Sequence, residues 1–154
     1  MSRKKVYLDR TGGEAAAVFL HDAEVIPAGT TIYSMPVKER NTEYDRWAEA
    51  YDIHFIFEDR KPEAPFYAVP WMDIFAVDSR GGYIGTLGQL TDMAGEAPVC
   101  YVDRDRHCWR IAENGPEFVQ HAACWRSFLQ EEQEVRLYAS REQAEQELDF
   151  INLF

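Results

Sequence analysis

Two histidines and two cysteines are the side chains of this sequence best suited to hold a metal or act as a nucleophile. His121 and Cys124 are three positions apart, so on a helix they would share one flank and could join His107 or Cys108 at a tetrahedral zinc. The same residues could form a cysteine–histidine nucleophile pair. However, no Cys-x-x-Cys is present, and no nucleophile elbow or oxyanion-forming glycine loop surrounds a cysteine. We therefore predict no metal, no cofactor and no catalytic residue, and keep a small metal-dependent or cysteine hydrolase as an alternative.

Two aspartates near the middle of the chain are the next candidates, because paired carboxylates can exchange protons with a substrate. Asp73 and Asp78 are five positions apart, so side-chain alternation along a strand sends them to opposite faces. Asp78 is instead expected to cap the turn at Gly81 and Gly82, and Asp73 to accept a local hydrogen bond. These glycines lead into another strand and not into a helix, so they do not predict a phosphate-binding loop.

The last quarter of the chain is strongly acidic. Between Phe128 and Phe154 only Arg136 and Arg141 oppose the carboxylates of Glu131, Glu132, Glu134, Glu142, Glu145, Glu147 and Asp149. Such a run is typical either of a docking face for a basic protein or of the solvated side of a helix and its approach. The candidate partner-binding residues are Glu131, Glu132, Glu134, Glu142 and Glu145.

The overall composition limits the classes of partner. The 154 residues carry 27 acidic and 16 basic side chains, a formal net charge of −11, which argues against binding to nucleic acid or to an anionic membrane. An apolar fraction of 46% excludes intrinsic disorder, and charges interrupt every apolar run before it could span a bilayer. The N-terminus lacks a signal-peptide apolar segment, so we predict a cytoplasmic protein with reduced cysteines and a single domain over residues 1–154.

The candidate residues lie on or beside a run of hairpins. Residues 71–111 alternate short apolar runs with turn residues, which predicts four consecutive antiparallel strands. The turns are expected at Asp78–Gly82 and Asp103–Arg106, with a longer connection through Gly88–Pro98. Gly85, inside the second strand, predicts a bulge or a close backbone approach.

The flanking regions add helices and shorter strands. Helices are predicted to begin at Asn41-Thr42, at Gly115-Pro116 with a core stripe to Leu129, and after Ser140 with Ala144, Leu148 and Ile151 inward. Further strands are predicted at Val6–Leu8, Ala17–Leu20, Val25–Ile26, Thr31–Ser34, Ile53–Phe57 and Val135–Tyr138. The fold class is therefore α+β, a mostly antiparallel sheet with helices packed largely on one face.

Four aromatic residues raise a further functional possibility. A ligand-binding or regulatory module could have an aromatic pocket built from Trp47, Trp71, Tyr83 and Trp109. Packing of these side chains in the core is the favoured interpretation, because large aromatic residues are highly buried on average.

The order of motifs in the hairpin region is itself informative. Its pieces are Ile74-Phe75-Ala76-Val77-Asp78 leading into Gly81-Gly82-Tyr83, then Pro98-Val99-Cys100-Tyr101-Val102-Asp103, and finally Ile111-Ala112-Glu113-Asn114 before Glu117-Phe118. This order of strand, Asp/Gly turn, strand, apolar strand, short return strand and helix resembles the SUKH superfamily, which includes bacterial toxin-immunity proteins and a fungal cell-wall regulator. The opening helix and Leu-Pro turn usual in that family have no counterpart in residues 1–52.

The resemblance implies a non-enzymatic protein that binds a cognate protein toxin, often a nuclease. An acidic surface would complement the basic substrate site of such a toxin, in agreement with the net charge of −11. We therefore predict an immunity protein that neutralises its toxin in the cytoplasm, with no nucleic-acid or membrane partner.

Overall fold

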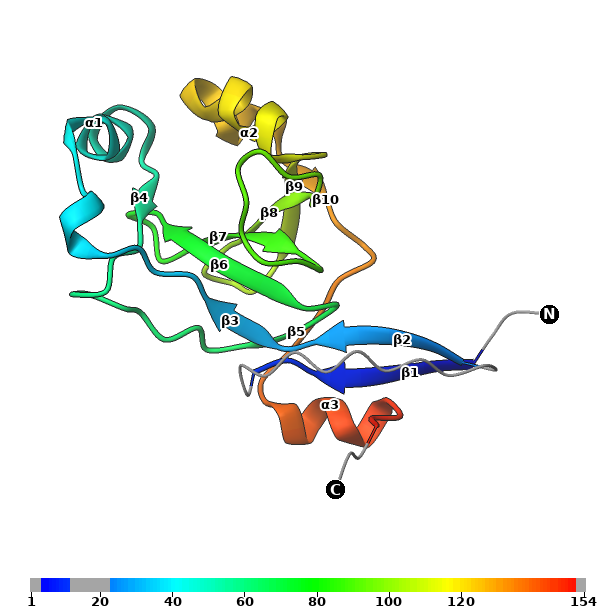
Figure 1. Cartoon of the computed structure of the whole chain (residues 1–154). Coiled ribbons are helices and arrows are strands. Elements are labelled where there is room, and N and C mark those ends of the chain that lie inside the picture. Colours follow the sequence, from blue (N-terminus) through cyan, green and yellow to red (C-terminus); the bar gives the residue numbers. More distant parts are fainter. Residues whose placement is uncertain (1–3, 12–22, 152–154) are drawn as a thin grey trace.

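The computed structural model describes residues 4–11 and 23–151, and its centre is a seven-stranded sheet (Figure 1). The strands follow the spatial order β10 (Gln130–Glu131), β9 (Cys108–Ala112), β8 (Val99–Val102), β7 (Tyr83–Leu87), β6 (Met72–Val77) and β3 (Thr30–Ile32). A further strand, β4 (His54–Phe55), pairs with the end of β6 that β3 does not reach. Most pairings are antiparallel, and the predicted α+β fold class is confirmed.

The four middle strands of the sheet are the predicted hairpins. β6 pairs with β7, β7 with β8 and β8 with β9, each time antiparallel, so that prediction is confirmed. Side chains close both turns: Asp78 Oδ1 accepts the N–H of Gly82 at 2.6 Å, and Asp103 Oδ1 accepts that of His107 at 2.9 Å. The expected role of Asp78 as a turn cap is therefore confirmed.

Gly85 lies where β6 and β7 approach most closely. Its register partner is Ile74, and the pairing shifts at a bulge before Ala76. A Cβ at Gly85 would lie 2.6 Å from the carbonyl oxygen of Asp73, which no ordinary side chain tolerates. The close approach predicted from this glycine is therefore confirmed.

The first quarter of the chain contributes parallel strands. β1 (Lys4–Asp9) and β2 (Ala23–Ala28) pair in parallel as a two-stranded sheet that extends from one side of the molecule (Figure 1). β3 then joins the central sheet in parallel with β6. The strands predicted at Val6–Leu8, Val25–Ile26 and Thr31–Ser34 are thus present with shifted ends, whereas Ala17–Leu20 lies outside the described residues.

Helices cover one face of the central sheet, as predicted. The 3-10 helix η1 (Val37–Glu39) leads into α1 (Thr42–Tyr51), and α2 (Gly115–His121) continues into a second 3-10 helix, η2 (Ala122–Phe128). Trp47 of α1, Phe118 of α2 and Trp125 of η2 pack with Phe75 and Ile84 in one hydrophobic core. This face carries the candidate site described below.

The helix expected from Gly115 to Leu129 is shorter than predicted. Its α-helical part ends at His121, and the chain continues as a 3-10 helix that contains a non-helical residue, Cys124, with φ −141°. A 3-10 helix has three residues per turn, so its side chains point in other directions than those of an α-helix. Trp125 is therefore buried, while Cys124 is exposed.

The opposite face of the sheet is covered by extended chain. A second core there includes Phe66, Cys100 and Cys108, and the antiparallel pair β5 (Tyr67–Val69) and β11 (Arg136–Tyr138) lies beside it. The strand predicted at Ile53–Phe57 is reduced to β4, where only two residues pair.

The last helix, α3 (Arg141–Glu147), packs in a separate core with Tyr67 and Tyr138 and lies across the molecule from α1 and α2 (Figure 1). It ends at Glu147, so Ile151, expected on its inner face, follows the helix instead. Among the described residues no helix is both long and apolar enough to cross a membrane.

Candidate functional site

The histidines and cysteines considered for zinc or nucleophilic chemistry do not come together. Cys108 packs in the core on the face of the sheet opposite α2 and η2, whereas His121 and Cys124 lie on that helical segment. His121 stacks on Phe128 with ring centroids 3.6 Å apart, and His107 is exposed. No group of three potential metal ligands occurs within residues 4–11 and 23–151. The alternative hydrolase built on these residues therefore has no assembled site.

The buried thiols are arranged for packing. Cys100 and Cys108 are both buried and free, on neighbouring strands β8 and β9. A hydrogen bond in which the Cys108 thiol donates to Cys100, together with burial, raises the pKa of Cys108 far above its usual range. Both effects favour the thiol over the thiolate, which is the nucleophilic form.

The four aromatic residues considered for a pocket are also dispersed. Trp47 and Trp109 border the core beneath the helices, and Tyr83 borders the core on the other face of the sheet. The indole N–H of Trp71 donates to Thr31 Oγ1 at 2.8 Å. These four side chains do not line one cavity, so that aromatic pocket is absent from the described part of the chain.

The acidic residues near the C-terminus occupy two separate places. Glu131 and Glu134 are exposed on and after β10, at the edge of the central sheet, whereas Glu142 and Glu145 are on α3 at the other side of the molecule (Figure 1). Glu132 Oε2 accepts from Arg110 Nε at 2.6 Å, and its side chain is only 6% exposed. Glu132 therefore links the end of β10 to β9. A partner-binding role for Glu131, Glu134, Glu142 and Glu145 stays a prediction.

The structure instead contains a cleft that sequence reasoning did not find. It has a volume of about 510 Å³ and opens between η1, α1, α2 and the loop of residues 88–98, over the helical face of the sheet. We call it the acidic cleft, because all its charged lining residues are carboxylates; the lining consists of Tyr33, Met35, Glu39, Asn41, Glu43, Tyr44, Trp47, Phe55, Phe75, Thr91, Asp92, Met93 and Val119.

Aromatic rings form the floor of the acidic cleft. Phe55 is central: its ring centroid lies 5.0 Å from that of Tyr44, 5.5 Å from Trp47 and 5.8 Å from Phe75. Tyr44 meets Phe55 edge to face, the arrangement that the ring quadrupoles favour. These contacts fix the floor in a defined shape before any ligand binds.

A buried aspartate positions the loop that forms one wall. Asp73 is 1% exposed, and its carboxylate accepts from Thr31 Oγ1 at 2.7 Å and from the backbone N–H of Thr91 at 2.8 Å. It thereby ties the 88–98 loop to β3 and β6. The expectation of a local hydrogen bond for Asp73 is therefore wrong, because both partners of its carboxylate are distant in sequence.

A glycine brings the same loop against α2. The N–H of Gly115 donates to the carbonyl of Gly95 at 3.1 Å, and a Cβ at Gly115 would lie 2.9 Å from the Cα of Met93 and closer still to its carbonyl. Only glycine at the start of α2 permits this approach. Met93 and Val119, which come from these two packed segments, both line the cleft.

The other wall is α1, which is fixed at both ends. Asn41 caps its N-terminus by accepting the N–H of Glu43 at 2.9 Å. At its C-terminus the indole of Trp125 donates to the carbonyl of Tyr51 at 2.7 Å. The residue that ends the helix, Asp52, has a positive φ of 58° and a hydrogen-bonded carboxylate.

That carboxylate belongs to a partly buried ion-pair network, in which Asp78 is the buried member. Arg126 of η2 donates to Asp52 at 2.8 Å and to Asp78 at 2.9 Å, and Tyr101 donates to Asp78 at 2.6 Å. Burial would raise the pKa of both aspartates, but these hydrogen bonds, with those from Ser79 to Asp52, outweigh it and hold both values below normal. Burial and its bond to Asp78 raise the pKa of Tyr101 to about 12. The network joins α1, η2 and the β6–β7 turn.

The carboxylates at the rim of the cleft differ from Asp52 and Asp78 in their exposure and pairing. Glu39 and Asp92 are exposed, and neither has an ion-pair partner among the described residues. Glu43 pairs with Arg46 and also accepts the indole N–H of Trp47 at 3.2 Å. The hydrogen bond from Arg46 is the main cause of the lowered pKa of Glu43. Glu39 and Asp92 are therefore the rim carboxylates open to a positively charged partner.

Exposed apolar side chains border the acidic cleft. Tyr33 is 40% and Val119 45% exposed, although both line it. Val37 and Leu90, at 46% and 64% exposed, lie on the two segments that border it. Large apolar side chains gathered around a polar depression are typical of a surface that binds another protein.

The arrangement suits a cation with an apolar stem. An aromatic floor attracts a positive charge through its ring faces, and free carboxylates at the rim supply counter-charges. A lysine or arginine side chain has both an apolar stem and a charged end.

Sequence reasoning could have found part of this site. Tyr44 and Trp47 have the spacing of one face of α1 and both line the cleft, whereas core packing is the interpretation that the sequence favours for Trp47. Asp92 and Val119 come from other segments, and nothing in their spacing links them to α1. The strongest available signal was Glu39, Glu43 and the aromatic residues in one short stretch.

Comparison with known proteins gives no relative. No protein-family model, no curated protein and no solved structure matches the chain.

Proposed function

We propose that this chain is a non-enzymatic binding protein of the toxin-immunity type, a divergent SUKH member that neutralises a basic, nuclease-type toxin in the cytoplasm. The toxin would dock at the acidic cleft and place a lysine or arginine side chain over the aromatic floor. The observation that carries this proposal is the combination of free carboxylates, Glu39 and Asp92, with exposed apolar side chains around one preformed depression.

The energetics favour this use of the cleft over catalysis. A cation over aromatic faces gains about 0.5–2 kcal/mol, more when it is desolvated, and Tyr33 and Val119 can exclude water around it. The net charge of −11 adds long-range attraction for a basic protein, which raises the association rate at low ionic strength. Association should therefore slow as salt is added, because salt screens charges over about 10 Å.

The test compares two pairs of neutralised carboxylates. The partner is a basic toxin encoded beside this gene, and binding is measured by surface plasmon resonance at two salt concentrations, with growth rescue in parallel. Glu39→Gln with Asp92→Asn removes the free charges of the cleft, and Glu131→Gln with Glu134→Gln removes the same charge near β10. Glu132 is left intact because it is bonded to Arg110.

We expect the cleft variant to bind about tenfold more weakly, while the β10 variant loses only part of the association rate. Val119→Asp should weaken binding further by placing a carboxylate in the apolar border. If only the β10 variant binds weakly, the toxin docks at the edge of the sheet and not at the acidic cleft. Failure of the wild-type protein to bind or neutralise any neighbouring basic toxin would contradict the immunity function.

A further inference from the structure

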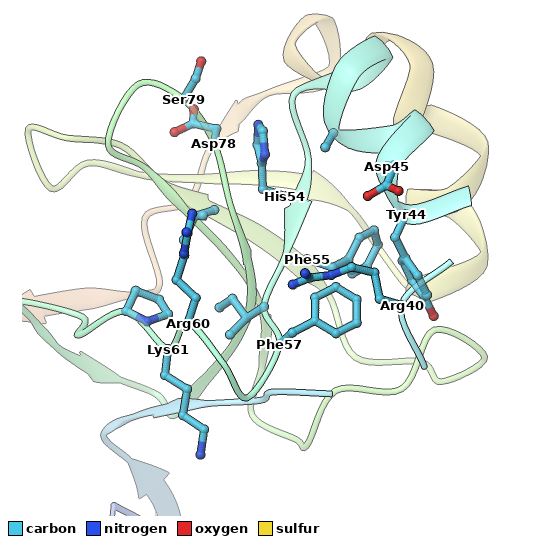
Figure 2. Close-up of a pocket in the computed structure, with 14 residues that line it drawn as sticks. Arg40, Tyr44, Asp45, His54, Phe55, Phe57, Arg60, Lys61, Asp78 and Ser79 are labelled. Atoms are coloured by element: carbon cyan, nitrogen blue, oxygen red, sulfur yellow. The ribbon is translucent and has the colours of Figure 1, made fainter. Parts of the chain in front are cut away.

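A second depression lies on the other side of Tyr44 and differs from the acidic cleft in charge. Its volume is about 460 Å³, and it shares Tyr44 and Phe55 with the cleft (Figure 2). We call it the basic hollow, because Arg40, Arg60 and Lys61 all line it. Tyr44 therefore lies between a cleft whose charged lining residues are all carboxylates and a hollow lined by three cationic side chains as well as Asp45 and Asp78.

The cations of the basic hollow are only partly neutralised. Arg60 and Lys61 are exposed and have no ion pair with any residue that the structure describes. Arg40 reaches Asp59 at 3.2 Å, but this pair is exposed, and such pairs contribute about 0–1 kcal/mol. Figure 2 shows Arg40 and Arg60 on two sides of the Phe57 ring, with Lys61 directed away. The two guanidinium groups are therefore the available anion-binding groups.

The floor of the hollow is apolar and rigid. Phe57 is 4% exposed, and the Arg40 guanidinium lies 4.4 Å from the centre of its ring. Tyr44 meets the same ring edge to face at 5.5 Å, and Val77 of β6 completes the floor. Because Phe57 itself is buried, the apolar surface open to a ligand is that of the half-buried lining residues Tyr44, Ala48 and Val77. Inorganic phosphate would leave this surface exposed to water, whereas an aryl or alkyl group would cover it.

The surrounding charge limits the size of the anion. Asp45 of α1 and Asp78 of the β6–β7 turn both line the hollow, and the whole chain carries a net charge of −11. A polyanion such as a nucleic acid would be repelled from this surface. A single negative charge at Arg60 meets less repulsion, since Asp78 is paired with Arg126, and it can accept two hydrogen bonds from one guanidinium.

We propose that the basic hollow binds a small carboxylic acid with an aryl or alkyl body, its carboxylate on Arg60 and Arg40 and its apolar body on the half-buried side chains of Tyr44, Ala48 and Val77. The ligand would occupy one side of Tyr44 while the acidic cleft stays open on the other. This site does not depend on the proposed toxin partner, and its test uses this chain alone.

The probe is N-acetyl-phenylalanine, and the matched neutral compound is N-acetyl-phenylalaninamide. Binding is followed by two-dimensional NMR of the labelled protein, with shifts assigned for Arg60 Nε and for the Phe57 region. We expect saturable binding of the carboxylate with a Kd of about 1 mM, and binding of the amide at least about tenfold weaker. Arg60→Gln should weaken carboxylate binding about fivefold to tenfold and leave amide binding unchanged.

Arg104→Gln makes the same chemical change at an exposed turn residue outside the hollow and should leave binding unchanged. Equal binding of acid and amide, unchanged binding by the Arg60 variant, or shifts confined to another surface would each overturn the proposal. So would the absence of saturable shifts at about 10 mM carboxylate, ten times the expected Kd. A pentapeptide that ends in a free phenylalanine carboxylate should bind no more tightly than the probe if the ligand is a small acid. Tighter binding of that peptide would overturn the small-acid proposal in favour of a chain terminus.

Discussion

The carboxylates behind the acidic cleft and those at its rim differ in burial and in pairing. Asp73 and Asp78 are 1% and 7% exposed, and every contact described for them is with a donor that fixes the backbone or another element. Glu39 and Asp92 are exposed and have no counter-charge among the described residues. The first pair can stabilise the fold, whereas the second pair can contribute to binding at little cost to it.

This difference separates two properties that a binding protein needs. A preformed cleft loses less conformational entropy when a partner binds, so the buried groups increase affinity without touching the ligand. The carboxylates at the rim contact the partner directly and favour a partner that carries a positive charge. Substitutions behind the cleft should therefore reduce stability first, and substitutions at the rim should reduce binding alone.

The largest effect is expected from Asp73→Ala. The change leaves Thr31 Oγ1 and the Thr91 N–H without their acceptor in a buried place, so the free energy of unfolding should fall by about 3 kcal/mol. Urea denaturation measures this fall, and hydrogen exchange should show faster opening of residues 88–95. Asp73→Asn is the control, since its amide oxygen can still accept the Thr91 N–H while its NH2 group donates to Thr31 Oγ1, and a loss of about 1 kcal/mol is expected. Equal stability of the alanine variant and the wild type would contradict the anchoring role.

A smaller effect is expected in acid, from the network around Arg126. The folded-state pKa values of Asp52 and Asp78 lie below the usual 3.8, so their contribution is complete above that value and is lost as pH falls through it. The free energy of unfolding of the wild type should therefore decrease from about pH 5 to about pH 3.

Arg126→Met removes the cation that the two aspartates share. It should reduce the free energy of unfolding by about 2 kcal/mol at pH 7, because the buried carboxylates lose their counter-charge. Its further loss in acid should be shallower than that of the wild type, as measured by urea denaturation across the pH range. Parallel pH curves for the two proteins would show that Arg126 does not lower these pKa values.

The buried and the rim groups were not equally predictable from the sequence. Asp78 could be assigned to its turn because its hydrogen bond to Gly82 spans four residues, within reach of local rules. Its ion pair with Arg126 joins residues 48 positions apart, and no local pattern encodes such a contact. The hairpins from Met72 to Ala112 were predicted for the same reason, since short turns leave few ways to pair the strands.

The helical region was predicted less well because packing, not local preference, decides it. Phe118, Ala122 and Trp125 have the spacing of one α-helical face, yet the chain changes to 3-10 turns after His121. Trp125 is nevertheless buried and bonded to α1, so its tertiary contact is satisfied in the altered geometry. The acidic cleft escaped prediction because its walls come from segments far apart in the sequence.

The smallest effect on stability is expected from the rim variant Glu39→Gln with Asp92→Asn. Neither side chain has an ion pair among the described residues, and the asparagine can still accept the N–H of Ala94 as Asp92 does at 3.0 Å. The free energy of unfolding should therefore change by less than about 0.5 kcal/mol, as at other exposed positions. Thermal denaturation and urea denaturation both measure it, with Asp73→Ala as the contrasting variant. A loss above about 1 kcal/mol would place the rim carboxylates in the fold itself, and any loss of toxin binding by this variant could then no longer be assigned to the cleft surface.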